Sequence, residues 1–442
     1  MTQALTPAQR IGYGAGDLGI NLYFITTMTF LLYFYTDVFG LSPAVAGGVF
    51  LVARIVDAVT DPLMGMIAER TRSRWGRLRP YLLFGAVPMG IIAILTFTVP
   101  DLSDSGKIWW AYVTYVGFGI AYTVVGIPYS ALTASLTRDH HERTLLSTIR
   151  MAFAFAGAYV VSVGMMPLVG RFETPAQGFQ ITMVLFALIA TLLLCTTFVS
   201  TEERVRPPVD QRLSVADSLK AVFLNPPLMV LMVLFTGGML SFTIRQTVTV
   251  YFFKYNLGRE DLIPLFFGVT LPVMFVGLLA VPALARRVGK AGGIVVGALV
   301  TIAGSIGMFV TPYDQVPLIF FWACVMALGG TPIAVLGWAM IPDTVEYAQW
   351  RSGLRADGAI FSFASFFQKL AKALGGAGVA GVMALAGYVA NVEQSGTSLS
   401  AIHLMMTLAP GAIMLVMILA AGFYRLDAKT HAQIVADLEA RA

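Results

Sequence analysis

The chain has 442 residues, of which 57% are hydrophobic and only 12% are charged, and its formal net charge at pH 7 is +5. A soluble protein carries about twice that charged fraction, so the composition excludes an ordinary soluble protein. Apolar stretches of about 20 residues, the length that crosses a bilayer as a helix, recur along the whole chain. A transmembrane β-barrel would instead show short alternating segments. The sequence therefore predicts an all-α membrane protein.

Twelve membrane-spanning helices are predicted in chain order. They are expected near residues 18–39, 42–68, 80–99, 108–136, 145–169, 178–200, 227–254, 262–286, 292–311, 316–341, 358–389 and 400–424. The one long polar segment between them, residues 201–226, falls at the chain midpoint. We expect this segment to be a cytoplasmic loop between two six-helix bundles, residues 1–200 and 227–425. A cytoplasmic tail is expected at residues 426–442.

The two halves of the sequence resemble each other. The stretch LYFYTDVFG, which begins at Leu32, parallels VYFFKYNLG, which begins at Val250. Each is followed by an apolar span that contains a proline, Pro62 or Pro282, and then by a basic loop. Parallel six-span repeats on either side of a central loop are typical of the major-facilitator fold of two six-helix halves.

The basic residues predict the orientation in the membrane. The loop RTRSRWGRLR, Arg70 to Arg79, is strongly basic, and in a twelve-span count it lies on the same side as both termini. The loops on the other side hold few basic residues. By the positive-inside rule, both termini should face the cytoplasm.

A second role is open for part of this loop. Arg74 and Arg77 are candidates for a gate that pairs with acidic residues in the other half, namely Asp343 and Glu346 in PDTVEYAQW. The alternative is that the arginines only fix the topology.

Two carboxylates interrupt the second predicted span, in ARIVDAVTDPLMG. Asp57 and Asp61 are four residues apart and share one helix face, and Arg54 lies close to that face. Because charges in lipid are costly, this face must point into the bundle or a wet cavity. Oxygen ligands suit a hard cation, and a proton is the alternative, since neighbouring carboxylates can share one. Ion pairs that only stabilise the fold are a further alternative, although the equivalent stretch near 274–283 has no charge.

Two other charged residues lie within or beside predicted spans. Arg245, in SFTIRQTVTVYF, sits in the middle of the seventh span. It is a candidate substrate contact, and an interhelical ion pair or a snorkelling side chain is the alternative. Asp17, near the start of the first span, is expected to sit at the membrane interface, and a contact with Lys372 or with arginines at the gate is the alternative.

Four stretches carry a resemblance to a known family. They are YFYTDVFGLS, LVARIVDAVTDPLMG with RTRSRWGRLRPYLL, AYTVVGIPYSAL, and DTVEYAQWRSGLRADGAIFSFASFFQKLAKALGGA. In collinear order, the chain resembles the melibiose permease family, the glycoside–pentoside–hexuronide:cation symporters. The resemblance implies secondary active transport by alternating access, in symport with Na⁺ or H⁺. It also implies a multi-pass protein of the bacterial inner (plasma) membrane.

The resemblance implies a cation site at Asp57 and Asp61, with an oxygen from Thr123. Lys369, in SFFQKLAKALGG, would lie beside the carboxylates. Thr60 stands where the melibiose permeases have an asparagine, so it would offer a hydroxyl oxygen instead of an amide. The choice between Na⁺ and H⁺ therefore stays open.

The substrate side departs further from the melibiose permeases. Asn21 and Gly126 stand where those permeases have aspartates that grip the sugar, and Ser130 replaces a tryptophan. Arg150 matches an arginine of that pocket and Tyr122 a tyrosine. Ser365 stands where those permeases have a threonine. The pocket keeps its basic residue and loses its acids, which favours an anionic sugar such as a hexuronide and leaves a neutral glycoside open.

Other functions and partners are expected as follows. The sequence contains no credible nucleophile–base or metal constellation, so an enzyme is not expected. A cation-coupled transporter of another solute, such as a lysophospholipid, is the alternative function, and a non-transporting sensor is a rival of another class. We expect no cofactor apart from the coupling cation. The expected partners are a small hydrophilic substrate and the lipid bilayer, without nucleic acid, and the protein is expected to be a monomer.

Overall fold

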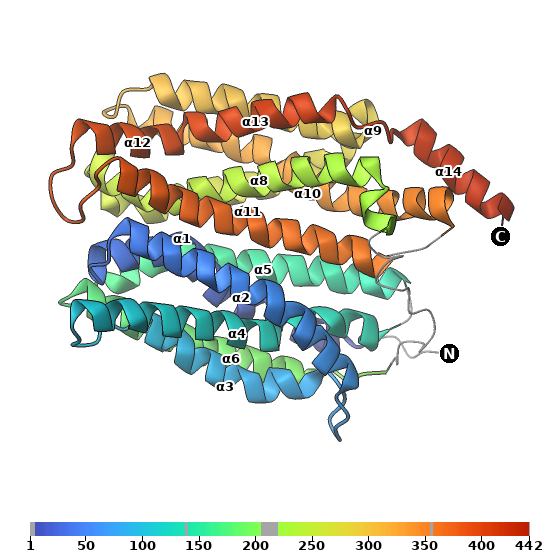
Figure 1. Cartoon of the computed structure of the whole chain (residues 1–442), viewed down its shortest axis with the longest axis horizontal. Helices are drawn as coiled ribbons and strands as arrows, with labels where there is room; N and C mark the ends of the chain where they lie inside the picture. The colour runs from blue at the N-terminus through green and yellow to red at the C-terminus, as the bar shows by residue number, and fades with distance from the viewer. Residues whose placement is uncertain (1–4, 138–139, 205–219, 354–356, 442) are drawn as a thin grey trace. The chain divides into compact units, whose positions relative to one another are not determined.

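The computed structural model describes residues 5–137, 140–204, 220–353 and 357–441 (Figure 1). Helices are the only regular elements in these ranges. This confirms the predicted all-α class.

The first half contains six long helices and a short π-helix. They are α1 (Pro7–Tyr33), the π-helix η1 (Phe34–Val38), α2 (Pro43–Arg70), α3 (Arg79–Thr96), α4 (Asp104–Leu136), α5 (His140–Val169) and α6 (Pro175–Ser200). Three of the helices begin with a hydroxyl N-cap followed by proline, at Thr6, Ser42 and Thr174. The hydroxyl oxygen accepts a hydrogen bond from a backbone N–H group of the first turn that has no partner within the helix. Proline has no backbone N–H group that needs a partner, so each hydroxyl–proline pair defines where its helix starts.

The second half has the same kind of elements. They are α8 (Pro226–Tyr251), the π-helix η2 (Phe252–Asn256), the 3₁₀-helix η3 (Glu260–Leu262), α9 (Ile263–Val310), α10 (Val316–Ser352), α11 (Asp357–Leu385), α12 (Gly396–Met406), α13 (Leu408–Ala421) and α14 (Ala428–Arg441). Helix α9 is 48 residues long and covers two predicted spans. The two spans meet at Gly289, where a φ of 76° breaks the helix. Only glycine adopts such an angle without strain.

The number of spans is lower than predicted when it is counted by length and composition. Nine helices in the described part of the chain are long and apolar enough to cross a membrane, or ten if α12 and α13, bent by 41°, form one span. One of the nine is the broken helix α9, which this count treats as a single span although it covers two of the predicted spans. The protein is a multi-pass membrane protein, and twelve spans stays a prediction.

The internal sequence repeat has a structural counterpart. The two similar stretches contain the π-helices η1 and η2, each five residues long, directly after α1 and α8. Each is followed by a glycine with positive φ, Gly40 at 84° and Gly258 at 65°. A π-helical turn is rare, so its recurrence at matching positions supports two related halves.

The chain forms two compact units. The first comprises Met1–Val209, Ile263–Phe267 and Tyr388–Val392, and the second comprises Asp210–Leu262, Gly268–Gly387 and Glu393–Ala442. The predicted boundaries at residues 200 and 227 stay a prediction, and part of the predicted loop, residues 205–219, lies outside the described residues.

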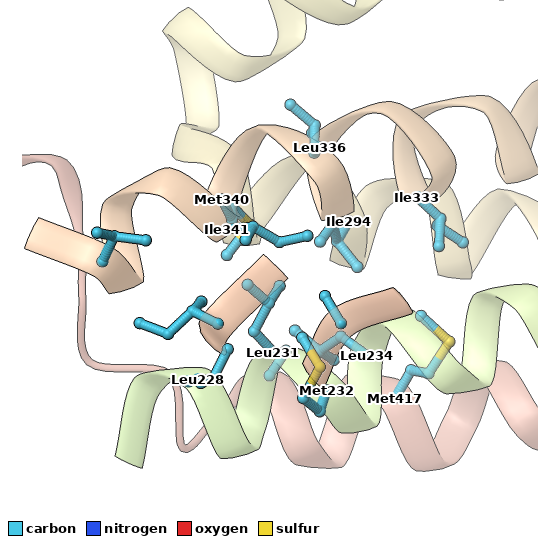
Figure 2. Packing of buried hydrophobic residues seen from close by; sticks show 14 of the residues in the cluster. Leu228, Leu231, Met232, Leu234, Ile294, Ile333, Leu336, Met340, Ile341 and Met417 are labelled. Carbon is cyan, nitrogen blue, oxygen red and sulfur yellow. The ribbon is translucent and has the colours of Figure 1, made fainter. Parts of the chain in front are cut away.

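Apolar side chains hold the helices of each unit together. In the first unit α1 packs against α5 and α6, and α2 packs against α4. Figure 2 shows the core of the second unit, where Leu228 and Leu231 of α8 lie among side chains of α9, α10 and α13. Packed cores of this kind place side chains at fixed positions, which is what a binding site on facing helices requires.

Candidate functional site

Helices α2 and α4 place the predicted acidic pair against a complementary helix face. The Thr123 hydroxyl of α4 donates to Asp61 Oδ1 of α2 over 2.7 Å. One turn earlier on both helices, a Cβ built at Gly119 would lie 2.8 Å from Asp57 Oδ1. The two helices therefore run in the same direction here. Spacing by four on each keeps these side chains in register.

Asp57 has a cationic neighbour on its own helix. Arg54 Nη1 donates to Asp57 Oδ2 over 2.6 Å, and Arg54 Nη2 donates to the Tyr115 hydroxyl over 2.8 Å. Asp57 is only 5% exposed. A buried carboxylate requires a paired charge or hydrogen bonds, and Arg54 supplies both to Asp57. The ion pair that the sequence left as an alternative is therefore present beside the acidic pair.

The oxygen atoms of this region fit a hard cation or a proton as cargo. The Thr60 hydroxyl is buried and has no hydrogen-bond partner among the described residues. A buried polar group without a partner is unusual and costly. The hydroxyl oxygens of Thr60 and Thr123 and the carboxylates of Asp57 and Asp61 are of the kind that a hard cation prefers. The same carboxylates accept a proton.

Sequence reasoning missed two residues of this region, Tyr115 and Gly119. With Thr123 they form a series spaced by four on α4, which would have indicated a common face. Which face of α4 meets α2 was not evident from the sequence.

Replacing Gly119 with alanine is expected to weaken cation binding by about tenfold or more. A real Cβ essentially never lies 2.8 Å from another heavy atom, so Asp57 must move away from its place. Geometry at an ion site is sensitive to such shifts. The cation dependence of uptake measures the effect. Gly65→Ala, on α2 with nothing within 4 Å of the new Cβ, is the matched control, and equal cation affinity in both variants would contradict the site.

Two candidate substrate residues of the first unit, Arg150 and Asn21, contact Asp17. Arg150 Nε of α5 lies 3.3 Å from Asp17 Oδ2 of α1, and the Asn21 side chain donates to the Asp17 carbonyl over 2.8 Å. Asp17 is only 6% exposed. Asp17 therefore pairs with an arginine inside the first unit, and its place at the membrane interface stays a prediction. Its partner lies 133 residues away in the sequence, so the spacing of charges along the chain did not reveal the pair.

Aromatic rings flank this ion pair. Tyr13 and Tyr129 stack at 5.2 Å, and the Arg150 guanidinium lies over the Tyr129 ring, also at 5.2 Å. The Tyr122 ring lies 6.5 Å from Phe24. Sequence reasoning missed Tyr13, which lies before the first predicted span, and Tyr129, which reads as an ordinary residue of an apolar span.

The remaining candidates of the first unit lie on α4. Gly126 is one turn from Tyr122, whose ring atoms would be 3.5 Å or more from an added Cβ. Ser130 is exposed. Both leave room where a larger side chain would stand.

Three predicted substrate residues belong to the second unit. Arg245 lies on α8 and is partly exposed, yet its Nη1 atom is buried without a hydrogen-bond partner among the described residues. Ser365 and Lys369 lie one turn apart on α11 and are partly buried. The predicted position of Lys369 beside the acidic pair involves both units and stays a prediction.

The predicted gate residues have partners inside their own units. Arg74 stacks on the neighbouring Trp75 ring, and the Arg77 backbone N–H donates to Glu203 over 3.0 Å. In the second unit Asp343 pairs with Lys290 at 2.6 Å. Glu346 pairs with His431 of α14. A gate between the halves stays a prediction.

Comparison with known proteins identifies the family. The family described as MFS/sugar transport protein matches residues 12–428. The chain belongs to this family. It comprises the glycoside–pentoside–hexuronide:cation symporters of the major facilitator superfamily, so the resemblance stated above is confirmed. The protein is a transporter and not an enzyme.

Two curated relatives span nearly the whole chain. The uncharacterized symporter YnaJ of Bacillus subtilis is 38% identical, over 99% of this chain and 96% of its own. The isoprimeverose transporter of Lactiplantibacillus pentosus is 36% identical, over 98% and 91%. A crystal structure of a bacterial homologue of the human lysosomal transporter Spinster matches with a TM-score of 0.68 and 14% identity, and it covers 97% of this chain and 98% of that chain. That likeness supports the major-facilitator fold.

Proposed function

We propose that this transporter takes up a sugar or sugar acid in symport with Na⁺ or H⁺, which binds at Asp57 and Asp61. The observation that carries the proposal is the acidic pair of α2 in contact with α4, in which Asp57 is buried and Asp61 accepts from Thr123, with the unpaired Thr60 hydroxyl on the same helix turn. Acidic residues in a membrane span are costly and therefore rare, and those that occur mark functional sites.

The chemistry of coupling follows from charge. A bound cation neutralises part of the negative charge of Asp57 and Asp61, while Arg54 holds Asp57 in place through its 2.6 Å hydrogen bond. Coupling requires that the protein with both ligands reorients more readily than the protein with one. Alternating access, as in other transporters built from repeats, then converts the cation gradient into accumulation of the solute.

A sugar-like substrate is supported by the family and by the names of relatives. The family is described as sugar transport, and one relative is named an isoprimeverose transporter. A lysophospholipid is not favoured by these findings. We propose that the protein acts as a monomer.

The charge of the substrate depends on which arginine is available. Arg150 already pairs with Asp17 at 3.3 Å, so its charge is largely balanced. Arg245 has a buried Nη1 without a partner among the described residues. A guanidinium binds a carboxylate with two parallel hydrogen bonds. We therefore assign recognition of an acidic group to Arg245 instead of Arg150.

An uptake panel of neutral glycosides, pentosides and hexuronides tests both the function and this assignment. Accumulation of at least one class is expected, and Arg245→Gln should reduce uptake of an acidic sugar by about tenfold or more, since a charge-assisted hydrogen bond contributes about 1.5–3 kcal/mol. Neutral sugars should be affected less. The exposed Arg171→Gln is the control. Equal losses for acidic and neutral sugars would refute the role of Arg245, and no uptake of any sugar by the wild type would refute sugar transport.

The orientation proposed from the basic loops has its own test. Single cysteines are introduced at Ser73, Ser105 and Ala440, in a background with Cys195 and Cys324 replaced by alanine. All three positions are exposed. An impermeant thiol reagent added outside should label only Ser105→Cys, because the positive-inside rule places the other two in the cytoplasm. Labelling of Ser73→Cys from outside would reverse the orientation.

A further inference from the structure

Helices α3 and α4 form an apolar groove in the first unit. It has a volume of about 250 Å³ and is lined by Tyr81, Phe84, Gly85, Pro88, Ala121 and Val124. Tyr81, Gly85 and Pro88 follow one face of α3, and at a rise of 1.5 Å per residue the seven steps from Tyr81 to Pro88 cover about 10 Å. Phe84 is 59% exposed at its edge. The groove is therefore an elongated apolar site on the surface of the unit.

The basic loop Arg70–Arg79 leads directly into one end of this groove. Tyr81 is the third residue of α3, and its hydroxyl hydrogen-bonds with Thr71 of the loop at 2.5 Å. Trp75 connects the two regions. Its ring lies 5.4 Å from the Phe84 ring, and the Arg74 guanidinium lies 4.1 Å above the Trp75 ring. Cationic and apolar surfaces are thus continuous.

Part of the loop is fixed by bonds that leave other arginines available. Glu203 accepts the backbone N–H groups of Arg77, Leu78 and Arg79. The Arg79 guanidinium donates to the Phe198 carbonyl over 2.6 Å. Arg72 and Arg74 are exposed, and no carboxylate among the side chains that the structure describes forms an ion pair with either. Two exposed guanidinium groups are therefore available on this loop, and that of Arg74 lies over Trp75, whose ring contacts Phe84 of the groove.

We propose that this surface binds an anionic phospholipid, with an acyl chain in the α3–α4 groove and the phosphate on Arg72 and Arg74. Guanidinium groups bind phosphate in fork geometry, and basic residues next to a span attract anionic lipids. Charge complementarity selects this occupant over a zwitterionic lipid, and the apolar groove selects it over a free phosphate. The proposal does not depend on the transported solute or on cation coupling.

Native mass spectrometry of the purified full chain tests the proposal. The protein is titrated with phosphatidylglycerol or phosphatidylcholine of identical acyl chains. The first phosphatidylglycerol should bind about tenfold tighter than phosphatidylcholine. Arg72→Gln/Arg74→Gln should lose most of this difference, since each surface arginine contributes several-fold in affinity. Equal binding of the two lipids to the wild type would overturn the proposal.

A matched pair of variants separates this site from general attraction to a basic protein. Arg286→Gln/Arg287→Gln removes two exposed arginines of α9, just before its break at Gly289, in the second unit. It should keep the preference for phosphatidylglycerol, and an equal loss in both double variants would contradict a specific site.

The groove is tested by filling it and by shortening the lipid. Ala121→Phe should weaken phosphatidylglycerol binding although the net charge is unchanged. Dihexanoyl phosphatidylglycerol should bind the wild type more weakly than its long-chain counterpart, which tests the groove without any substitution. If neither change weakens binding, only the headgroup is recognised and the assignment of the groove is wrong.

Discussion

Asparagine at position 57 or 61 is expected to reduce solute accumulation to simple equilibration, while the amount of protein in the membrane stays unchanged. Both acids lie on the face of α2 that meets α4, and Thr123 donates directly to Asp61. An amide keeps the shape of the side chain but removes the charge that a cation requires. Uptake in cells, measured beside the protein level, gives the result. Exposed Asp104→Asn, at the start of α4, is the control.

The ion pair between Arg54 and Asp57 makes a sharper version of this test possible. If Asp57 served only to pair with Arg54, then Arg54→Gln/Asp57→Asn would remove both charges together and restore transport. Replacing both members of a buried pair is often harmless, whereas removing one is costly. If Asp57 binds the cation, the double variant stays inactive. Recovered accumulation in the double variant would assign Asp57 a structural role.

Arg150→Gln is expected to destabilise the protein and to impair transport of every substrate, acidic or neutral. It leaves Asp17, whose side chain is 9% exposed, without its ion-pair partner. Breaking a buried pair costs about 3–5 kcal/mol, and we expect about 2–3 kcal/mol because the Arg150 side chain keeps 30% of its exposure. The shift of the unfolding midpoint measures the effect.

The double variant Asp17→Asn/Arg150→Gln is the matched partner. It removes both charges and should regain most of the lost stability. If the double variant is as unstable as Arg150→Gln, the two residues are not coupled. If Arg150→Gln selectively loses acidic substrates at normal stability, Arg150 and not Arg245 recognises the acid.

The sequence predicted features that depend on local pattern and composition. Charge within an apolar span pointed to Asp57 and Asp61, and the similar stretches of the two halves proved to contain matching π-helices, η1 and η2. The roles of Thr123 and Arg150 came from the family resemblance. Each of these predictions depended on residues close together in the sequence or on a known motif.

Contacts between distant segments were not predictable in the same way. The Asp17–Arg150 pair and the Glu203 contacts with the basic loop join residues more than 120 positions apart. They depend on how helices rotate about their axes when they pack, and many rotations satisfy the same apolar pattern. The missed role of Gly119 has the same cause, since it requires the register of α2 against α4.

The central claim is that a cation gradient drives accumulation through the acidic pair of α2. Reconstituted vesicles with an imposed Na⁺ gradient or an imposed proton gradient, applied one at a time, test it most directly. One of the two gradients should drive the transported solute above its equilibrium level in the wild type and fail to do so in Asp61→Asn. Accumulation that needs neither gradient, or that persists in Asp61→Asn, would contradict it.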